Sequence, residues 1–169
     1  LIDQKFLEGE TSDEVISISI DDMITELQPN LWEKNLERLV DFGHSFSPLL
    51  EMKSLEDPDV KSLTHGEAVS VDVVFSFCLS YHRGLLPKVE LLRVVQLSTD
   101  MKLPTYHPYF SRPLLLWEAL MDTKKHRNGK QNLPTPVRVG ESIFLNDVTL
   151  DDVRNTASIY KSLCGTSCP

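Results

Sequence analysis

The sequence predicts a mainly α-helical fold with little sheet, and two observations lead to this prediction. Apolar side chains recur at helical spacing along most of the 169 residues. Residues that favour helix starts and helix ends delimit these stretches. Only residues 137–145 are expected to form a short strand or hairpin, so the chain is expected to be one helical domain over residues 1–169.

The N-terminal part is expected to contain an extended start, three helices and a charged loop, in the order 1–10, 11–27, 30–41, 42–52 and 51–64. Thr11 and Glu14 have the spacing of a capping box, which opens the first helix. Pro29 ends that helix, and Asn30 can cap the next one. The third helix is expected because apolar residues recur at helical period between residues 42 and 52.

The remainder is expected to contain four more helices, at residues 65–83, 87–98, 113–121 and 149–163. Gly84 ends the first of these as a C-cap, and Thr149 with Asp152 starts the last. Residues 106–113 are rich in proline and aromatic residues and are expected to form a connection, and residues 124–130 a basic loop. The total is seven helices.

Composition excludes several classes of protein. Hydrophobic residues make up 41% and charged residues 25%, which is ordinary for a globular protein. The formal net charge of -8 argues against a general binder of nucleic acid or anionic membranes. No run of about 18 apolar residues exists, so no membrane span is expected and the protein is expected to be cytoplasmic. The chain starts at Leu1 with no signal-peptide pattern and is interpreted as a piece of a longer protein.

The three cysteines do not form a recognisable metal or disulfide framework. Cys78 lies within an apolar run and is expected to be a buried thiol. Cys164 and Cys168 follow the last helical pattern, where two unpaired thiols are favoured over a metal site or a disulfide.

Two histidines, each beside a glycine near a predicted helix start, are candidates for metal binding. His44 lies in the string Asp-Phe-Gly-His and His65 in His-Gly-Glu-Ala-Val. Neutral imidazole is the commonest zinc ligand, and a catalytic zinc takes three protein ligands and one open position. The spacing of 21 residues matches no local zinc signature, so capping or core histidines are the alternative.

The residues around both histidines resemble the signature of the dehydroquinate synthase superfamily. The resemblance is carried by one string of spaced residues and by the segment 65–69 that follows it. It covers residues 18–69 closely and continues more loosely to about residue 152. The string consists of Glu33, Glu37, Asp41, His44 and Pro48.

The resemblance implies the helical, metal- and substrate-binding C-terminal domain of a cyclase. It implies that His44 and His65 are two of three ligands of Zn²⁺ or Co²⁺, the third being a Glu on preceding chain. It also implies NAD⁺ as cofactor, although no G-x-G-x-x-G run is present here, so the NAD-binding N-terminal domain is absent from this chain. Partners implied by the family are that N-terminal half and a second copy in a homodimer.

Four departures from the 3-dehydroquinate synthase pattern bear on the substrate. Those enzymes usually show Lys, Arg, Asn and His at the positions of Met23, Glu37, Asp41 and Pro48. Losing Lys, Arg and His removes positive charge that would hold a substrate carboxylate. The pattern therefore resembles the sedoheptulose 7-phosphate cyclases, and within them the 2-epi-5-epi-valiolone synthases. Desmethyl-4-deoxygadusol synthases more often show Tyr-Gly-His-Thr-Trp and His-Gly-His.

Two charged clusters are candidates for contacts with a sugar phosphate. Glu33, Glu37 and Asp41 are spaced by four and would share one helix face, which the resemblance directs towards metal and substrate as catalytic residues. A solvated helix face is the alternative. Asp41, Pro48 and Met23 are expected to bind substrate. In the basic loop, the phosphate is expected to meet members of the set Lys125, His126 and Arg127, with a surface charge run as the alternative.

The implied reaction converts sedoheptulose 7-phosphate to 2-epi-5-epi-valiolone with loss of phosphate. It proceeds by NAD-dependent transient oxidation, phosphate elimination, reduction and intramolecular aldol closure, and zinc polarises the hydroxyl that is oxidised. Alternatives are a related cyclase, of the desmethyl-4-deoxygadusol, deoxy-scyllo-inosose or 3-dehydroquinate type, and a non-catalytic helical binding module. Alone, the chain is expected to be inactive.

Overall fold

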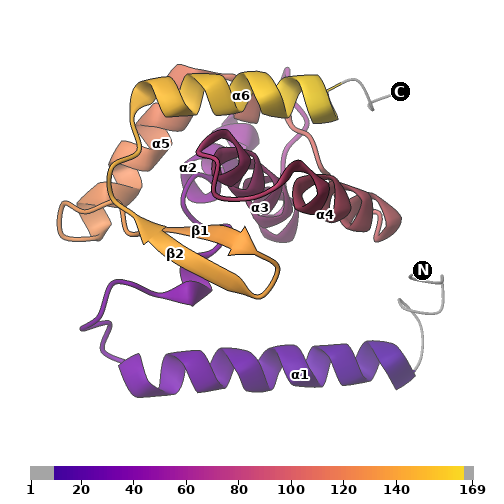
Figure 1. Ribbon diagram of the computed structural model, residues 1–169, viewed down its shortest axis with the longest axis vertical. Helices are drawn as coiled ribbons and strands as arrows, with labels where there is room; N and C mark the ends of the chain where they lie inside the picture. Colours follow the sequence, from indigo (N-terminus) through magenta and orange to yellow (C-terminus); the bar gives the residue numbers. More distant parts are fainter. Residues whose placement is uncertain (1–9, 166–169) are drawn as a thin grey trace.

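The computed structural model describes residues 10–165, and the predictions for residues 1–9 and for Cys168 lie outside them. Figure 1 shows a helical body from which the first helix stands apart, with one short hairpin crossing the body. The six α-helices described are α1 (Glu10–Leu27), α2 (Ser47–Glu56), α3 (His65–His82), α4 (Lys88–Asp100), α5 (Pro113–His126) and α6 (Leu150–Cys164). Within residues 10–165 the fold is mainly α, as predicted.

Helix α3 is the centre of the body because it carries the most continuous run of apolar residues. It packs against α2, α4, α6 and the hairpin. Phe75 of α3 makes edge-to-face contacts with Phe46, Phe110 and Tyr160, at ring-centroid distances of 5.0, 5.9 and 5.8 Å. Aromatic pairs in this geometry stabilise a core beyond the area that they bury.

Capping boxes set the starts of two helices, and the one at α6 was predicted from the sequence. Thr64 and Glu67 form a reciprocal capping box that opens α3 at His65. Thr149 and Asp152 do the same for α6. In each box the two side chains satisfy backbone N–H groups that have no intrahelical partner. The starting point of α3 therefore places His65 on its first turn.

The helix predicted at residues 30–41 is wrong. Glu33 has a φ of +49°, and only the 3₁₀ turns Gln28–Asn30 and Leu39–Asp41 form in this region. The Asn30 side chain bonds both the N–H and the C=O of Asn35, at 3.1 and 2.7 Å. Side-chain bonds of this kind compete with a helical ladder, which is why the helical spacing is not realised.

The helix predicted at residues 42–52 begins later, at Ser47. Gly43 has a φ of +78°, so the backbone turns sharply before the helix begins. The side chain of Asp72, from α3, then accepts the backbone N–H groups of Ser45, Phe46 and Ser47 at 2.7–3.0 Å. The result is a fixed turn that leads into α2.

Two boundaries in the C-terminal half also differ from prediction. Helix α5 runs on to His126, so the predicted basic loop begins in its last turn. The hairpin is longer than predicted, with β1 (Leu133–Arg138) antiparallel to β2 (Glu141–Leu145). The connection at residues 106–113 contains the 3₁₀ turn Pro108–Ser111. No described helix is both long enough and apolar enough to cross a bilayer.

Candidate metal and substrate site

The two candidate histidines meet in space although 21 residues separate them. His44 lies in the turn before α2, and His65 is the first residue of α3. Their Nε2 atoms are 3.3 Å apart, and their ring centroids 5.2 Å. The convergence that the family resemblance required is therefore present.

The hydrogen bonds behind the rings determine what the two facing nitrogens carry. His44 Nδ1 lies 3.1 Å from the carbonyl oxygen of Phe42, and His65 Nδ1 lies 3.0 Å from Glu51 Oε2. Both partners are acceptors, so each Nδ1 is placed to donate a hydrogen bond, and in that tautomer of a neutral ring Nε2 presents a lone pair. Two lone pairs that face each other at this distance repel unless a cation lies between them.

The geometry fits a divalent ion held by two imidazoles. Two nitrogens bound to a tetrahedral zinc at about 2.0–2.1 Å lie about 3.3–3.4 Å apart, which is the separation seen here. A zinc-bound histidine usually donates its other ring N–H to a carboxylate or carbonyl, as both rings do. Among residues 10–165, however, no group of three or more His, Cys, Asp or Glu is placed to hold a metal. The described residues thus offer two candidate ligands.

Asp72 supports the turn that carries His44. Its side chain is completely buried, and it accepts the three backbone N–H groups that follow His44. Burial raises the pKa of the Asp72 carboxyl, and the three N–H donors act against that shift. A single charge in the apolar run of α3 was a signal in the sequence, because buried charges need partners.

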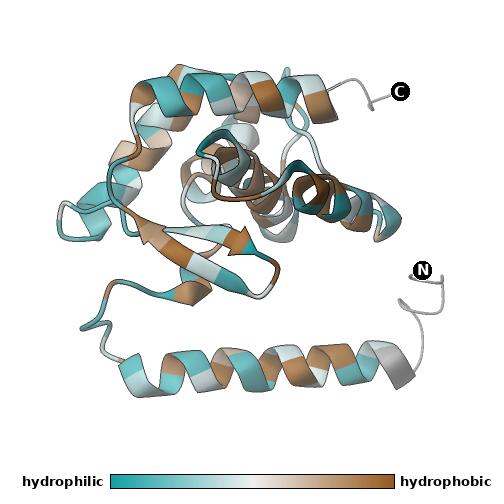
Figure 2. Cartoon of the chain, viewed as in Figure 1, coloured by the Kyte–Doolittle hydropathy of each residue, from teal (hydrophilic) through white to brown (hydrophobic). Residues whose placement is uncertain are grey.

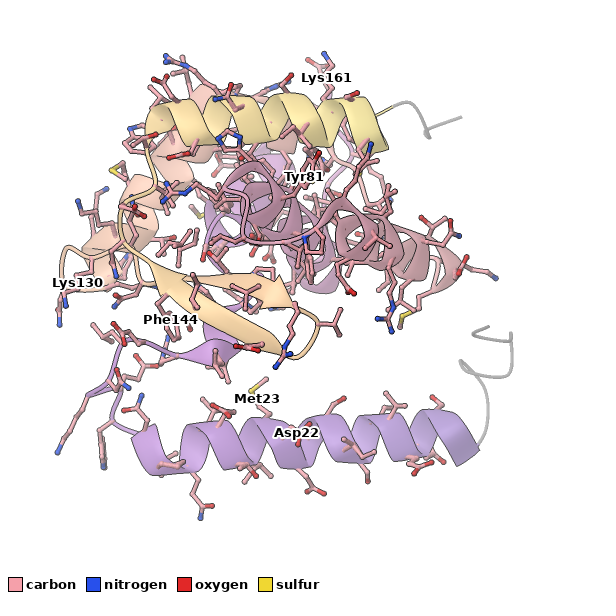
Figure 3. The ribbon with its side chains drawn as sticks, in the orientation of Figure 1. Asp22, Met23, Tyr81, Lys130, Phe144 and Lys161 are labelled. Atoms are coloured by element: carbon pink, nitrogen blue, oxygen red, sulfur yellow. The ribbon has the colours of Figure 1, made fainter. Side chains whose placement is uncertain are left out.

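A cavity of about 540 Å³ opens beside His44 and brings together most of the predicted substrate residues. Its walls come from α1, the segment before α2, α2 itself and the end of α5. In Figure 3, Met23 points from α1 towards the body. The predicted residues that line the cavity are Met23, Glu33, Asp41, His44, Pro48, His126 and Arg127.

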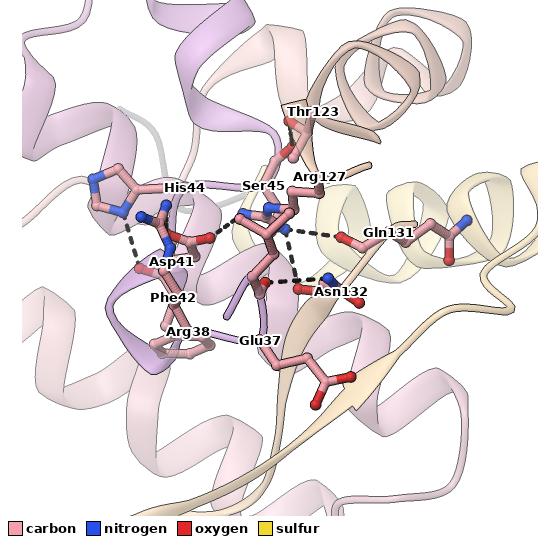
Figure 4. A network of polar contacts seen from close by, with 12 residues as sticks. Glu37, Arg38, Asp41, Phe42, His44, Ser45, Thr123, Arg127, Gln131 and Asn132 are labelled. Atoms are coloured by element: carbon pink, nitrogen blue, oxygen red, sulfur yellow. Dashed lines mark hydrogen bonds and ion pairs between the residues drawn. The ribbon is translucent and has the colours of Figure 1, made fainter. Parts of the chain in front are cut away.

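Three predicted residues lie outside this cavity. Glu37 lines a smaller neighbouring cavity of about 280 Å³, and in Figure 4 its side chain points away from Asp41. His65 lines a cavity of about 340 Å³ on the other side of Pro48. Lys125 is exposed and pairs with Asp122 at 3.0 Å. A larger apolar cavity of about 580 Å³ beside the hairpin contains none of the predicted residues.

The acidic stripe predicted on one helix face is wrong, because no helix forms there. Glu33 is largely exposed and pairs with Arg38. Asp41 is buried and takes an ion pair on each carboxylate oxygen, with Arg38 Nη2 at 2.7 Å and Arg127 Nη2 at 3.1 Å. Glu33 and Asp41 therefore line the same cavity because of the tertiary fold and not because they share a helix face.

Arg127, which was expected in a basic loop, is buried in the structure. Its Nη1 atom donates to the carbonyl oxygens of Gln131 and Asn132, at 2.9 and 3.1 Å, and lies 3.4 Å from Ser45 Oγ (Figure 4). Burial lowers the pKa of this guanidinium, and the Asp41 carboxylate opposes the shift. Arg127 therefore links the turn that carries His44 to the root of the hairpin.

Arg38 and Glu51 were missed by the sequence reasoning. Partial burial acts to lower the pKa of Arg38, but the hydrogen bonds to Asp41 and Glu33 outweigh it and raise the pKa. Arg38 had a local signal, its spacing of three residues from Asp41. Glu51 had none, because its partner His65 lies 14 residues away on another element.

Comparison with known proteins shows the family to which the chain belongs. Residues 2–126 match the family model described as 3-dehydroquinate synthase C-terminal. A 2-epi-5-epi-valiolone synthase from Streptomyces hygroscopicus subsp. jinggangensis is 44% identical over 90% of this chain and 37% of the relative. A demethyl-4-deoxygadusol synthase from Trichormus variabilis is 32% identical over 83% of this chain and 33% of the relative.

A solved structure shares both the fold and the sequence pattern. It is ValA, a 2-epi-5-epi-valiolone synthase from Streptomyces hygroscopicus subsp. jinggangensis 5008 with NAD⁺ and Zn²⁺ bound. The TM-score is 0.84 at 43% identity, over 92% of this chain and 42% of that one.

Fold, site and family match together define a C-terminal domain of the dehydroquinate synthase type, and the chain belongs to that family. Within the family it is similar to the 2-epi-5-epi-valiolone synthases, at 44% identity for the relative above. The chain spans about two fifths of the length of these relatives.

Proposed function

We propose that the chain is the C-terminal part of a phosphate-eliminating sugar-phosphate cyclase that converts sedoheptulose 7-phosphate to 2-epi-5-epi-valiolone. The observation that carries this proposal is the pair of facing Nε2 atoms of His44 and His65, 3.3 Å apart beside the cavity that His44 lines. The part of the relatives that this chain does not span would supply the third metal ligand and the NAD⁺ site. A homodimer belongs to the same proposal.

Zn²⁺ or Co²⁺ at the two histidines would supply Lewis-acid polarisation of a substrate hydroxyl, and NAD⁺ would supply the transient oxidation and reduction. Asp41 is the residue best placed to accept a hydrogen bond from the polyol, because its carboxylate lines the cavity beside His44. Glu33 lines the same cavity nearer to solvent. Glu37 lines the neighbouring cavity, so it would affect the substrate only indirectly, through the chain segment that it shares with Asp41.

The phosphate would bind at the end of α5. His126 is exposed, and it lines the cavity where the helix ends. Arg127 contributes positive charge there, but its Nη1 atom is already bonded to protein oxygens. Lys125 does not line the cavity and pairs with Asp122, so His126 and Arg127 carry this part of the proposal.

The choice of a substrate without a carboxylate rests on the positions that depart from the 3-dehydroquinate synthase pattern. Met23 and Pro48, at the positions where those enzymes usually show Lys and His, line the cavity, so these two missing cationic side chains would have faced the substrate. Asp41 adds a carboxylate to the same cavity at the position of an Asn. Related cyclases that make desmethyl-4-deoxygadusol, deoxy-scyllo-inosose or 3-dehydroquinate remain the alternative. Analysis of the product formed from sedoheptulose 7-phosphate and NAD⁺ separates them.

The central test is His44→Ala in the complete enzyme. One imidazole cannot hold the ion that two imidazoles and a third ligand hold, so we expect loss of stoichiometric zinc and of turnover. Zinc is measured by atomic emission on the purified protein and turnover by phosphate release. The matched control is His82→Ala at the far end of α3, where the ring pairs with Asp152 and is remote from the cavity.

Stoichiometric zinc with full turnover in His44→Ala would contradict the metal assignment. Zinc binding without any cyclase activity in the parent enzyme would instead favour a helical binding module with a vestigial metal site.

A further inference from the structure

We propose that Arg38 is a positioning residue of this site, which fixes the Asp41 carboxylate in the orientation that receives the substrate hydroxyl. This inference rests on the proposed function and adds a residue to it. Arg38 lies on the segment before the 3₁₀ turn Leu39–Asp41 and lines the cavity together with Asp41.

The contacts form one chain of alternating charge across the cavity wall. Arg38 Nη1 bonds Glu33, and its Nη2 bonds Asp41 Oδ1 at 2.7 Å. Arg127 Nη2 reaches Asp41 Oδ2 at 3.1 Å (Figure 4). Each oxygen of Asp41 is thus held by a different guanidinium. A carboxylate gripped on both oxygens cannot rotate about its Cβ–Cγ bond, yet each oxygen keeps a lone pair for a further donor.

The two arginines hold Asp41 from opposite parts of the fold. Arg127 is fixed by the carbonyl oxygens at the root of the hairpin. Arg38 belongs to an irregular segment whose other charged contact is the exposed Glu33. Removing Arg38 therefore leaves Asp41 on a single guanidinium and frees its rotation, while the link from Arg127 to the body persists.

The donors of Arg38 also argue for a role at the site. Its Nε–H is buried and has no hydrogen-bond partner among residues 10–165. A buried donor without a partner costs stability, and the geometry of Arg38 leaves that cost at Nε. It is the geometry that places Nη2 on the Asp41 oxygen.

The test is a double-mutant cycle of Arg38→Ala and Asp41→Asn in the complete enzyme, with sedoheptulose 7-phosphate and NAD⁺. We expect Arg38→Ala to lower kcat and kcat/KM together by about 10- to 100-fold, because a small misplacement of an orienting group has this effect. Arg38→Lys should recover part of the loss. Adding Arg38→Ala to Asp41→Asn should change little, because the two residues act as one unit.

Arg83→Ala is the matched control. Arg83 also bridges two acids, Asp147 and Asp152, and its side chain is 24% exposed against 22% for Arg38. It lies away from the cavity, so turnover should stay at the parent value, and thermal unfolding of both variants shows whether their folds are equally affected.

Additive losses in the cycle, or an Arg38→Ala variant as active as Arg83→Ala, would overturn the role of Arg38 and leave the proposed function standing. A parent enzyme that does not turn over sedoheptulose 7-phosphate would remove the proposed function, and the role of Arg38 with it.

Discussion

The state of the two facing imidazoles depends on the acceptors behind them. The Phe42 carbonyl is held by the backbone and cannot be removed by substitution, whereas Glu51 reaches His65 with its side chain from α2. Such carboxylate partners orient a ligand ring and fix its tautomer, and their loss commonly weakens metal binding. Glu51 is therefore the supporting residue whose contribution can be measured.

We expect Glu51→Ala to weaken zinc binding by the complete enzyme about 10- to 100-fold. The reason is that His65 would lose the acceptor that keeps its hydrogen on Nδ1. Competition with a chromophoric chelator measures the affinity. Glu56→Ala, at the exposed end of the same helix, is the control and should bind zinc like the parent. Equal affinities of the two variants would remove Glu51 from the site.

Helix α3 organises the site at the level of elements. Its first residue is His65. Its next two helical turns carry Val69, Asp72 and Val73, which contact the loop that holds His44. Gly43 lies against this surface so closely that a Cβ atom there would sit 2.9 Å from Val69 Cγ1 and 3.2 Å from the Val69 carbonyl oxygen. The close approach of the Gly43 backbone to α3 thus brings the two imidazoles together.

Gly43→Ala should destabilise the complete enzyme more than Gly84→Ala does. Both glycines have positive φ, +78° and +70°, so both substitutions share the backbone strain. Only the first adds a clash with α3, because nothing lies within 4 Å of a Cβ at Gly84. Overpacking of this kind costs about 1–3 kcal/mol, which denaturant unfolding resolves. Equal costs would show that the turn and α3 can accommodate a Cβ atom at Gly43, and would contradict this prediction.

At the scale of the whole molecule, two features stand out: a candidate metal site with too few ligands, and a helix with exposed apolar side chains. Within residues 10–165 the metal has two candidate ligands, and α1 exposes apolar side chains along its length (Figure 2). These exposed side chains are Val15, Ile16, Ile18, Ile20, Met23, Ile24 and Leu27. Apolar surface of this extent is typical of a contact face. It agrees with the proposal that this chain works together with the rest of a longer enzyme.

We expect the isolated 169-residue chain to lose zinc to a chelating resin and to show no turnover, whereas the complete enzyme keeps both. Two imidazoles leave a catalytic zinc one protein ligand short. Zinc content after resin treatment and phosphate release from sedoheptulose 7-phosphate are the measurements. Tight stoichiometric zinc in the isolated chain would show that two histidines and solvent suffice.

Local structure can be predicted from the sequence where both partners of a hydrogen bond lie within one helical turn. The capping box at Thr149 was predicted because its partner Asp152 lies three residues away, whereas the box at Thr64, which has the same spacing, was not predicted. The helical spacing of residues 30–41 was misleading, because bonds from Asn30 to Asn35 replace the helix. Asp41 was therefore named as a site residue on an incorrect geometric premise, and its contacts with Arg127 lie 86 residues along the chain.

The sequence alone determined the helical class, the glycine that ends α3, the N-terminal cap of α6 and the family, because these depend on residue spacing within short windows. The tertiary structure decided which side chains share the cavity and how the rings of His44 and His65 face each other. Those outcomes depend on buried long-range bonds, from Asp72 to the turn before α2 and from Arg127 to Asp41. Such bonds form only where burial and packing bring distant residues together.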